Sequence, residues 1–75
     1  MKQFRIYDGK FAASVKVEWI PESKHSAAHY AAFISVPFKD SRWHNLFVYD
    51  RDQEEAALIV ADDIARDELR DCTRI

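Results

Sequence analysis

The sequence has very little glycine, cysteine and proline. Its 75 residues include one glycine, one cysteine and two prolines. A loop that cradles a phosphate group needs glycines so that the backbone can approach closely, and the single glycine, Gly9, lies in a hairpin-turn motif. A lone cysteine, Cys72, excludes a disulfide within the chain. The cysteine usage therefore agrees with a reducing compartment.

Long apolar runs are missing as well. No stretch approaches the roughly 18 consecutive apolar residues that predict a membrane-spanning helix. Met1 is followed by KQFRIYDGK, which lacks the apolar segment of a secretory signal peptide. We therefore expect one soluble, cytoplasmic domain over residues 1–75, without membrane contact.

The composition is that of a folded protein whose charge is unevenly distributed. Apolar residues make up 48% of the chain, and the ten aromatic residues are five Phe, three Tyr and two Trp. Such a composition argues against disorder. Residues 1–51 hold eight Lys/Arg and five Asp/Glu, a balance of +3, whereas residues 52–75 hold three and eight, a balance of −5. A solvated helix face would explain this acidic segment, because charges on helices usually serve solubility.

The first 20 residues predict a β-hairpin. Asp8-Gly9 is a strong two-residue turn signal, because a type I′ turn needs a positive φ at both central positions. A turn at these residues pairs Ile6 with Phe11. Alternation then directs one set of side chains toward the core: Phe4, Ile6, Phe11, Ala13, Val15, Val17 and Trp19.

Weaker strand patterns follow Pro21, which ends the second strand because proline cannot donate to a ladder. The segment YAAFISVPF, residues 30–38, alternates and predicts a third strand that ends or lies at an edge near Pro37. Residues 39–45 predict a loop. The apolar residues 46–49 could form a fourth strand, with ambiguous facing.

The last third of the chain predicts an amphipathic helix. Asp50 or Asp52 can cap it, with Gln53 or Glu55 respectively in the capping-box position. The helix is expected to run to about Arg70, since the segment contains no glycine or proline. Its broad apolar stripe consists of Ala57, Leu58, Val60, Ala61, Ile64, Ala65 and Leu69.

The order of these elements predicts an α+β domain of two layers. A three- to four-stranded antiparallel sheet, beginning with the hairpin and continuing as a meander, packs one face on the C-terminal helix. Residues 71–75 would form a tail or a brief last strand. One helix covers one face of such a sheet, so Tyr7, Phe33, Trp43 and some of residues 46–49 are expected on the other face or its rim. Ile59 points away from the stripe.

No group of side chains predicts catalysis. His25 and His29, in KHSAAHYAAF, would share one face of a helix, but a zinc site needs three or four ligands. In a strand over residues 29–36 the two rings diverge, so we expect loop and strand-edge histidines and no metal. Cys72 is a poor nucleophile candidate, because the helix C-terminus and Asp71 disfavour its thiolate. We assign no catalytic, cofactor-binding or metal-binding residue and expect a protein that is not an enzyme.

Two segments resemble the DNA-binding domain of the plant ethylene-response-factor (ERF) type. GKFAASV, residues 9–15, is similar to that family's Gly-Lys-aromatic-Ala-Ala strand start, and DQEEAALIVADDIARDELRD, residues 52–71, carries its Glu-Glu-Ala-Ala helix start. The resemblance implies a three-stranded antiparallel sheet with a packed C-terminal helix, and a sheet that reads the major groove of DNA. Carried over, Arg5, Lys10 and Lys16 on the outer sheet face would contact DNA.

The overall charge favours a second interpretation, a protein-binding module. A pI near 5.8 argues against many phosphate contacts. In size and layout the chain looks like the small inhibitors that phages and mobile elements encode, anti-CRISPR proteins and polymerase inhibitors among them, which implies a host nucleoprotein complex as partner. Aromatic residues, which interface cores favour, are more numerous than one helix can cover. The predicted contact residues are Tyr7, Trp43, Ile59, Asp62 and Asp63.

Overall fold

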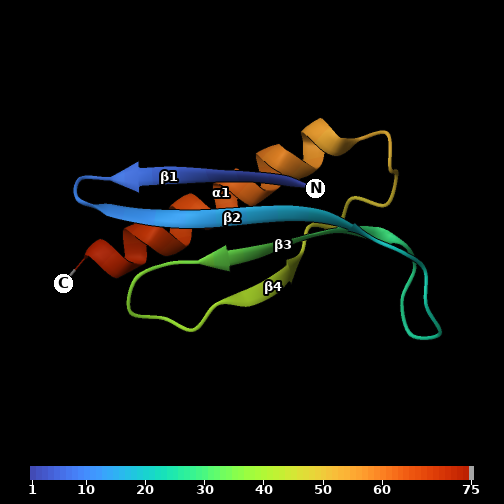
Figure 1. Ribbon diagram of the computed structural model, residues 1–75, viewed down its shortest axis with the longest axis horizontal. Helices are drawn as coiled ribbons and strands as arrows, with labels where there is room; N and C mark the ends of the chain where they lie inside the picture. The colour runs from blue at the N-terminus through green and yellow to red at the C-terminus, as the bar shows by residue number, and fades with distance from the viewer. Residues whose placement is uncertain (75) are drawn as a thin grey trace.

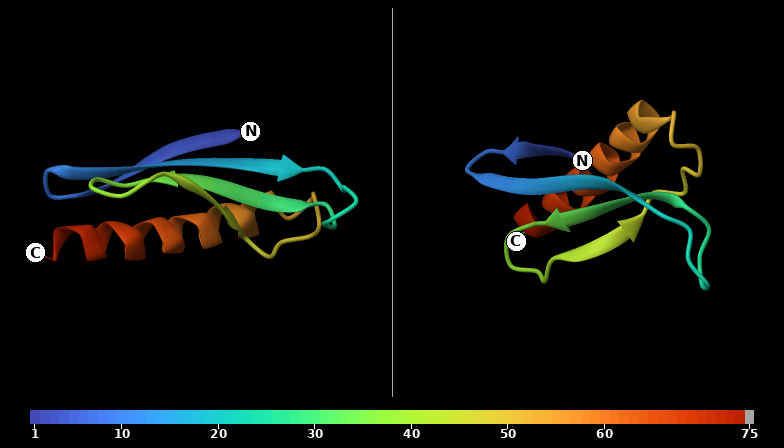
Figure 2. Two further views of the ribbon diagram at one scale, coloured as in Figure 1. Left: turned by 90° about the horizontal axis from the view of Figure 1, so that it is seen from below. Right: turned by 45° about the vertical axis from the view of Figure 1, so that its right-hand side comes forward.

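The computed structural model describes residues 1–74 as a sheet and a helix in two layers (Figures 1 and 2). Strands β1 (Lys2–Asp8), β2 (Phe11–Ile20), β3 (His29–Ser35) and β4 (Arg42–Asn45) form one antiparallel sheet in the order β1-β2-β3-β4. Helix α1 (Glu54–Thr73) lies on one face of this sheet, mainly against β2. The predicted α+β architecture, a meander followed by one packed helix, is confirmed.

The β1–β2 hairpin has the predicted facing but a different register. Ile6 pairs with Ala13, so Gly9 and Lys10 form the turn instead of Asp8 and Gly9. The predicted partner of Ile6 is therefore wrong by two residues. Gly9 has a φ of +60° whereas Lys10 does not have a positive φ, which fits a type II′ turn and not the expected type I′. A shift of two residues leaves every side chain on its predicted face, because the strand period is two.

The fourth strand lies earlier in the chain than predicted. Arg42–Asn45 forms β4 inside the segment 39–45 that was expected to be a loop, and residues 46–49 contain no strand. Trp43 pairs with Phe33 across the β3–β4 ladder, and the two rings lie 5.3 Å apart. Cross-strand aromatic pairs stabilise a sheet, which explains why this polar segment joins it.

The N-terminus of α1 does not use either predicted capping box. Gln53 is the N-cap residue and makes no capping hydrogen bond with its side chain. The Asp50 carboxylate instead accepts a hydrogen bond from the backbone N–H of Asp52, at 2.9 Å. This contact forms a turn before the helix, and the turn moves the helix start to Glu54.

The helix also continues beyond its predicted end at Arg70, through Thr73. The expected tail or strand over residues 71–75 is therefore wrong as far as Thr73, and Ile75 lies outside the described residues. Cys72 explains the extra turn. Its side chain is buried, and its Sγ donates to the backbone carbonyl of Pro37 at 3.1 Å.

The core lies between α1 and the inner face of the sheet. Ala57, Ala61 and Ala65 are fully buried and follow one another at successive helical turns, so their small side chains let the helix lie close to the strands. The described residues contain no helix that combines the length and the apolar character needed to cross a membrane. On the sheet, the buried residues include Ile6, Ala13, Val15, Val17, Ala32 and Ile34. Phe4, Phe11 and Trp19, also predicted to face the core, are partly buried.

Candidate functional site

The sheet face opposite α1 is open to solvent (Figure 2). Its middle carries small polar, basic and aromatic side chains in two rows of cross-strand neighbours, and the rows on either side of these include Tyr7 and Glu18. The first row is Arg5, Ser14 and Ser35, and the second is Gln3, Lys16, Phe33 and Trp43. We call this surface the outer sheet face.

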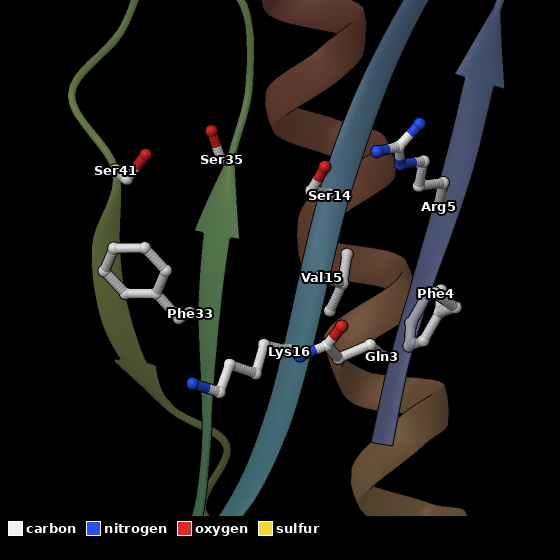
Figure 3. Close-up of a pocket in the computed structure, with 9 residues that line it drawn as sticks. All are labelled: Gln3, Phe4, Arg5, Ser14, Val15, Lys16, Phe33, Ser35 and Ser41. Atoms are coloured by element: carbon white, nitrogen blue, oxygen red, sulfur yellow. The ribbon is translucent and has the colours of Figure 1, made fainter. Parts of the chain in front are cut away.

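A shallow groove of about 500 Å³ crosses the outer sheet face (Figure 3). Its polar side chains are a guanidinium, an ammonium group, a carboxamide and three hydroxyls, and none of its lining residues is an acid. Such a lining suits an anionic or acceptor-rich ligand. The groove is lined by Gln3, Phe4, Arg5, Ser14, Val15, Lys16, Phe33, Ser35 and Ser41.

Two of the three predicted DNA-contacting residues lie in this groove. Arg5 and Lys16 come from neighbouring strands and are diagonal neighbours in the β1–β2 ladder. Lys16 Nζ lies 3.5 Å from Glu18 Oε1 at the groove margin, whereas Arg5 makes no ion pair within residues 1–74. Lys10 lies apart in the hairpin turn, with its Nζ 5.5 Å from the centre of the Phe11 ring.

A second feature is a concentration of exposed aromatic side chains. Seven large apolar side chains are exposed among the described residues, and four of them come from segment 38–49. This segment contains the edge strand β4 and the chain on either side of it (Figure 1). We call the four side chains the aromatic edge: Phe38, Trp43, Phe47 and Tyr49.

The backbone around Phe47 turns this side chain outward. The Leu46 N–H donates to the Tyr30 carbonyl, and the Tyr30 N–H donates to the Val48 carbonyl. Leu46 and Val48 therefore both bond the same residue of β3, Tyr30, as in a β-bulge. Phe47 lies between them and has a φ of +57°. Asn45 supports the bulge, because its Oδ1 accepts a hydrogen bond from the Phe47 N–H at 2.7 Å.

Phe38 is held outward in a similar way in the β3–β4 connection. Its φ is +68°, a conformation that bulky residues rarely adopt. The ring makes an edge contact with Phe11, at 5.9 Å between centroids, yet 77% of the residue stays exposed. The preceding residue, Pro37, is fixed by the Cys72 hydrogen bond to its carbonyl.

The structure separates the residues that the sequence predicted for protein binding. Tyr7 and Trp43 lie on the outer sheet face but on opposite edge strands. Ile59 is exposed on α1, in the other layer. The remaining two, Asp62 and Asp63, also lie on α1. Arg66 Nε donates a hydrogen bond to Asp62 Oδ2 at 2.8 Å, and this contact raises the pKa of the guanidinium above its usual value.

Sequence reasoning named none of Phe38, Phe47 and Tyr49 as contact residues, although some of residues 46–49 were expected on the open face or its rim. A weak signal was present for two of them, because Pro37 precedes Phe38 and Asn45 is placed to make the side-chain turn that exposes Phe47. An apolar run such as LFVY indicates burial, so alternation alone could not identify which of its members remain exposed.

His44 faces α1 from β4 and lies beside a carboxylate. Its Nε2 is buried, has no hydrogen-bond partner within residues 1–74, and lies 3.4 Å from Glu68 Oε1. Arg42 Nη2 lies 3.7 Å from the same oxygen. Glu68 therefore links the short edge strand to the helix, and this cluster supports the position of the aromatic edge.

The two histidines with helical spacing lie outside any helix. His25 is exposed in the β2–β3 loop, and His29 begins β3 with its Nδ1 2.7 Å from the Ala27 carbonyl oxygen. Residues 1–74 contain no cluster of three His, Cys, Asp or Glu side chains that could hold a metal ion.

Comparison with protein-family models, with curated proteins and with solved structures gives no match for this chain. The groove and the aromatic edge are therefore the features of the described residues that bear on function.

Proposed function

We propose that this protein is a small, non-enzymatic protein-binding module that contacts its partner through the aromatic edge. The partner, on this proposal, belongs to a nucleoprotein complex, as for the phage inhibitors that the chain is similar to in size. One observation carries the proposal. Four exposed aromatic residues lie within segment 38–49, and two of them occupy backbone conformations that direct their rings into solvent.

A positive φ at a bulky residue is unfavourable, and such outliers persist where the surrounding structure enforces them, often at binding sites. The hydrogen bond to Asn45 and the bonds of the neighbouring residues to β3 enforce the backbone conformation of Phe47. The hydrogen bond between Cys72 and Pro37 supports that of Phe38. Aromatic rings held in this way lose little conformational entropy on binding.

Edge strand β4 adds a second contribution. It is short, and its outer backbone groups have no neighbouring strand in the described sheet. A partner that adds an extended segment there would gain main-chain hydrogen bonds, while the flanking rings would supply specificity. The aromatic edge therefore supports recognition of a protein segment.

The test is a paired pull-down with purified variants as bait, from a lysate of the cells in which the protein acts. Phe38→Ser, Trp43→Ser and Phe47→Ser remove exposed rings of the aromatic edge. Tyr7→Ser and Ile59→Ser are matched controls, because these side chains are exposed to similar extents, 66% and 63%, in other parts of the surface. Nuclease treatment of the lysate separates direct protein contacts from nucleic-acid bridges.

We expect the edge variants to lose a specific protein that the wild type and both controls retain after nuclease treatment. Truncation of a central aromatic anchor typically costs about 2 kcal/mol or more, roughly thirty-fold in Kd. Circular dichroism should remain unchanged for Phe38→Ser and Phe47→Ser, since these highly exposed rings contribute little to folding. Trp43→Ser also removes the cross-strand pair with Phe33, so it counts only if its spectrum shows that the sheet still folds. Equal capture by all variants would contradict the proposal, and loss in Tyr7→Ser or Ile59→Ser would instead favour the site predicted from the sequence.

Duplex DNA binding is the alternative proposal, and the location of Arg5 and Lys16 on one open sheet face supports it. It predicts affinity that falls steeply with salt, by a slope of about −0.9 per phosphate neutralised. Submicromolar binding of a duplex at physiological salt, abolished by Arg5→Ala, would establish this alternative. We rank it second because two groove cations neutralise few phosphates.

A further inference from the structure

We infer that the groove on the outer sheet face binds a short segment of single-stranded nucleic acid. None of the residues that line the groove belongs to the aromatic edge, although Trp43 of that edge contacts the groove residue Phe33. Variants of the lining residues therefore test this inference independently of the proposed protein partner. It rests on three observations: the donors that line the groove, the contact of the lining residue Phe33 with Trp43, and the carboxylate of Glu18 beside Lys16.

The donors are arranged for a phosphodiester chain. Arg5 and Lys16 supply two positive charges from adjacent strands. The Cα atoms of diagonal neighbours lie roughly 7 Å apart, and the two side chains extend in different directions along the groove (Figure 3). Ser14, Ser35 and Ser41 extend the row of donors from β2 toward β4, as Figure 3 shows. Guanidinium, ammonium and hydroxyl groups are the side-chain donors that phosphates accept from.

The aromatic pair provides a surface for bases. Phe33 lines the groove, and its ring lies 5.3 Å from that of Trp43 with an interplanar angle of 55°. The Trp43 residue is 47% exposed, so its ring remains accessible for stacking. Proteins that bind single strands combine cationic grooves with such rings, because every base has a face that can stack.

The same chemistry argues against a duplex as the ligand. The bases of a duplex are stacked inside it and cannot lie on Phe33 or Trp43. Two cations also neutralise too few phosphates for strong duplex binding at physiological salt. A single strand can use rings and charges together, since its bases can splay away from its phosphates.

Glu18 makes the inference sharply testable. Its carboxylate lies 3.5 Å from Lys16 Nζ at the groove margin, and both side chains are partly exposed. An ion pair of this kind is weak, so a phosphate can replace the carboxylate. Removal of the Glu18 charge should therefore free Lys16 and strengthen binding, a gain that damage to the fold could not produce.

The experiment measures fluorescence anisotropy with a labelled oligo(dT) of about 12 nucleotides, a length within the site sizes typical of single-strand binders. We expect a Kd of about 10 µM at low salt and a salt slope of about −1.4, the value for two phosphates neutralised on a single strand. Arg5→Gln should reduce the slope by about 0.7. Lys24→Gln, the same charge change in the distant β2–β3 loop, should leave the slope unchanged.

Two further variants test the remaining observations. Glu18→Gln should strengthen binding about two- to three-fold at low salt, whereas Asp63→Asn, an equal charge change on the helix layer, should have a smaller effect. Phe33→Leu should weaken binding about tenfold, because base stacking is lost. Circular dichroism checks that this half-buried site still folds.

Several results would overturn the inference. One is the absence of oligo(dT) binding up to about 1 mM protein, a concentration beyond the usual non-specific range. A second is tighter binding of a duplex of equal length. A third is complete displacement of oligo(dT) by polyglutamate at equal charge. Equal effects of Arg5→Gln and Lys24→Gln would do so as well. None of these results affects the pull-down at the aromatic edge, because neither Arg5 nor Glu18 belongs to it.

Discussion

Tyr30 joins the sheet to the chain that precedes the helix. The residue is buried, its ring packs edge-on against Trp19 at 4.9 Å between centroids, and its hydroxyl donates to the Arg51 carbonyl. Burial raises the pKa of this phenol above its usual value of 10.0, and the negative charge of Glu54 adds to the rise. The neutral phenol is thus part of the folded structure, and its ionisation opposes folding.

This raised pKa predicts how stability depends on pH. Below pH 10 the phenol is neutral in both states, and its contribution to folding is fully present. Above pH 10 the unfolded chain releases the proton more readily than the folded one, so stability falls as pH rises toward and through the folded pKa. Thermal melts of the wild type between about pH 8 and pH 11 should show this loss.

Tyr30→Phe should destabilise the protein by about 1 kcal/mol at neutral pH, because the hydrogen bond to Arg51 is lost while the ring packing remains. Its melting temperature should then fall less steeply above pH 10 than that of the wild type. Tyr7→Phe, at an exposed ring, is the matched control and should leave neutral stability unchanged. A Tyr30→Phe melt with the alkaline slope of the wild type would refute the assignment.

Phe47 shows what residue-level patterns cannot predict. Its neighbours Leu46 and Val48 are buried, but all three residues are apolar, so the sequence shows no alternation that would single out Phe47. The sequence does not show that Leu46 and Val48 both bond Tyr30 in a bulge, because these hydrogen bonds join residues 16 and 18 positions apart. The exposed, strained ring is a tertiary result, and for this reason the sequence pointed to Tyr7 and Ile59 instead.

At the scale of elements, periodicity was enough for the hairpin and the helix. The inner faces of β1 and β2 follow from alternation, and the buried row on α1 follows from its helical stripe. The turn signal Asp8-Gly9 selected the wrong pair of turn residues, because one glycine satisfies either a type I′ or a type II′ turn depending on which position it occupies. The sequence could not distinguish them, since both registers bury the same face.

Strand β4 and the helix start depended on longer-range contacts. Arg42–Asn45 contains few residues with strand propensity, and its pairing with β3 places Trp43 against Phe33. The same strand carries His44 and Arg42 toward Glu68 of the helix. A segment that becomes a strand because of contacts with distant residues shows no strand pattern in its own sequence. The side of the molecule that carries the aromatic edge was therefore the hardest to predict.

The alanine row on α1 predicts how closely the helix and sheet must pack. Ala61 is completely buried, so Ala61→Leu inserts three carbons into a filled interface and should cost about 1–3 kcal/mol. Ala56→Leu is the matched control, because Ala56 is exposed on the same helix and leucine is a good helix former. Urea denaturation should show a lower midpoint for Ala61→Leu alone. Equal midpoints would mean that the helix does not lie close to β2.

At the scale of the whole molecule, the two layers differ in charge and in exposed chemistry. The helix carries seven of the acidic residues and two basic ones between Glu54 and Thr73. The outer sheet face carries the donors of the groove, and β4 and its flanks carry the exposed rings. If the aromatic edge binds a protein and the groove binds a single strand, both ligands contact the sheet layer, and the acidic helix face remains in solvent.

This division predicts that the outer face of the helix tolerates loss of charge. Asp62→Asn combined with Asp63→Asn removes two negative charges, and the protein captured by the aromatic edge should still be retained in the pull-down. Oligo(dT) affinity should change less than twofold at physiological salt, because charges farther away than about 8 Å are largely screened. The thermal midpoint should also change little, since the Asp62–Arg66 contact is a surface ion pair. If a folded double variant loses the captured protein, the aromatic edge is intact but does not suffice for binding. That result would contradict the division between the two layers and restore Asp62 and Asp63 as contact residues.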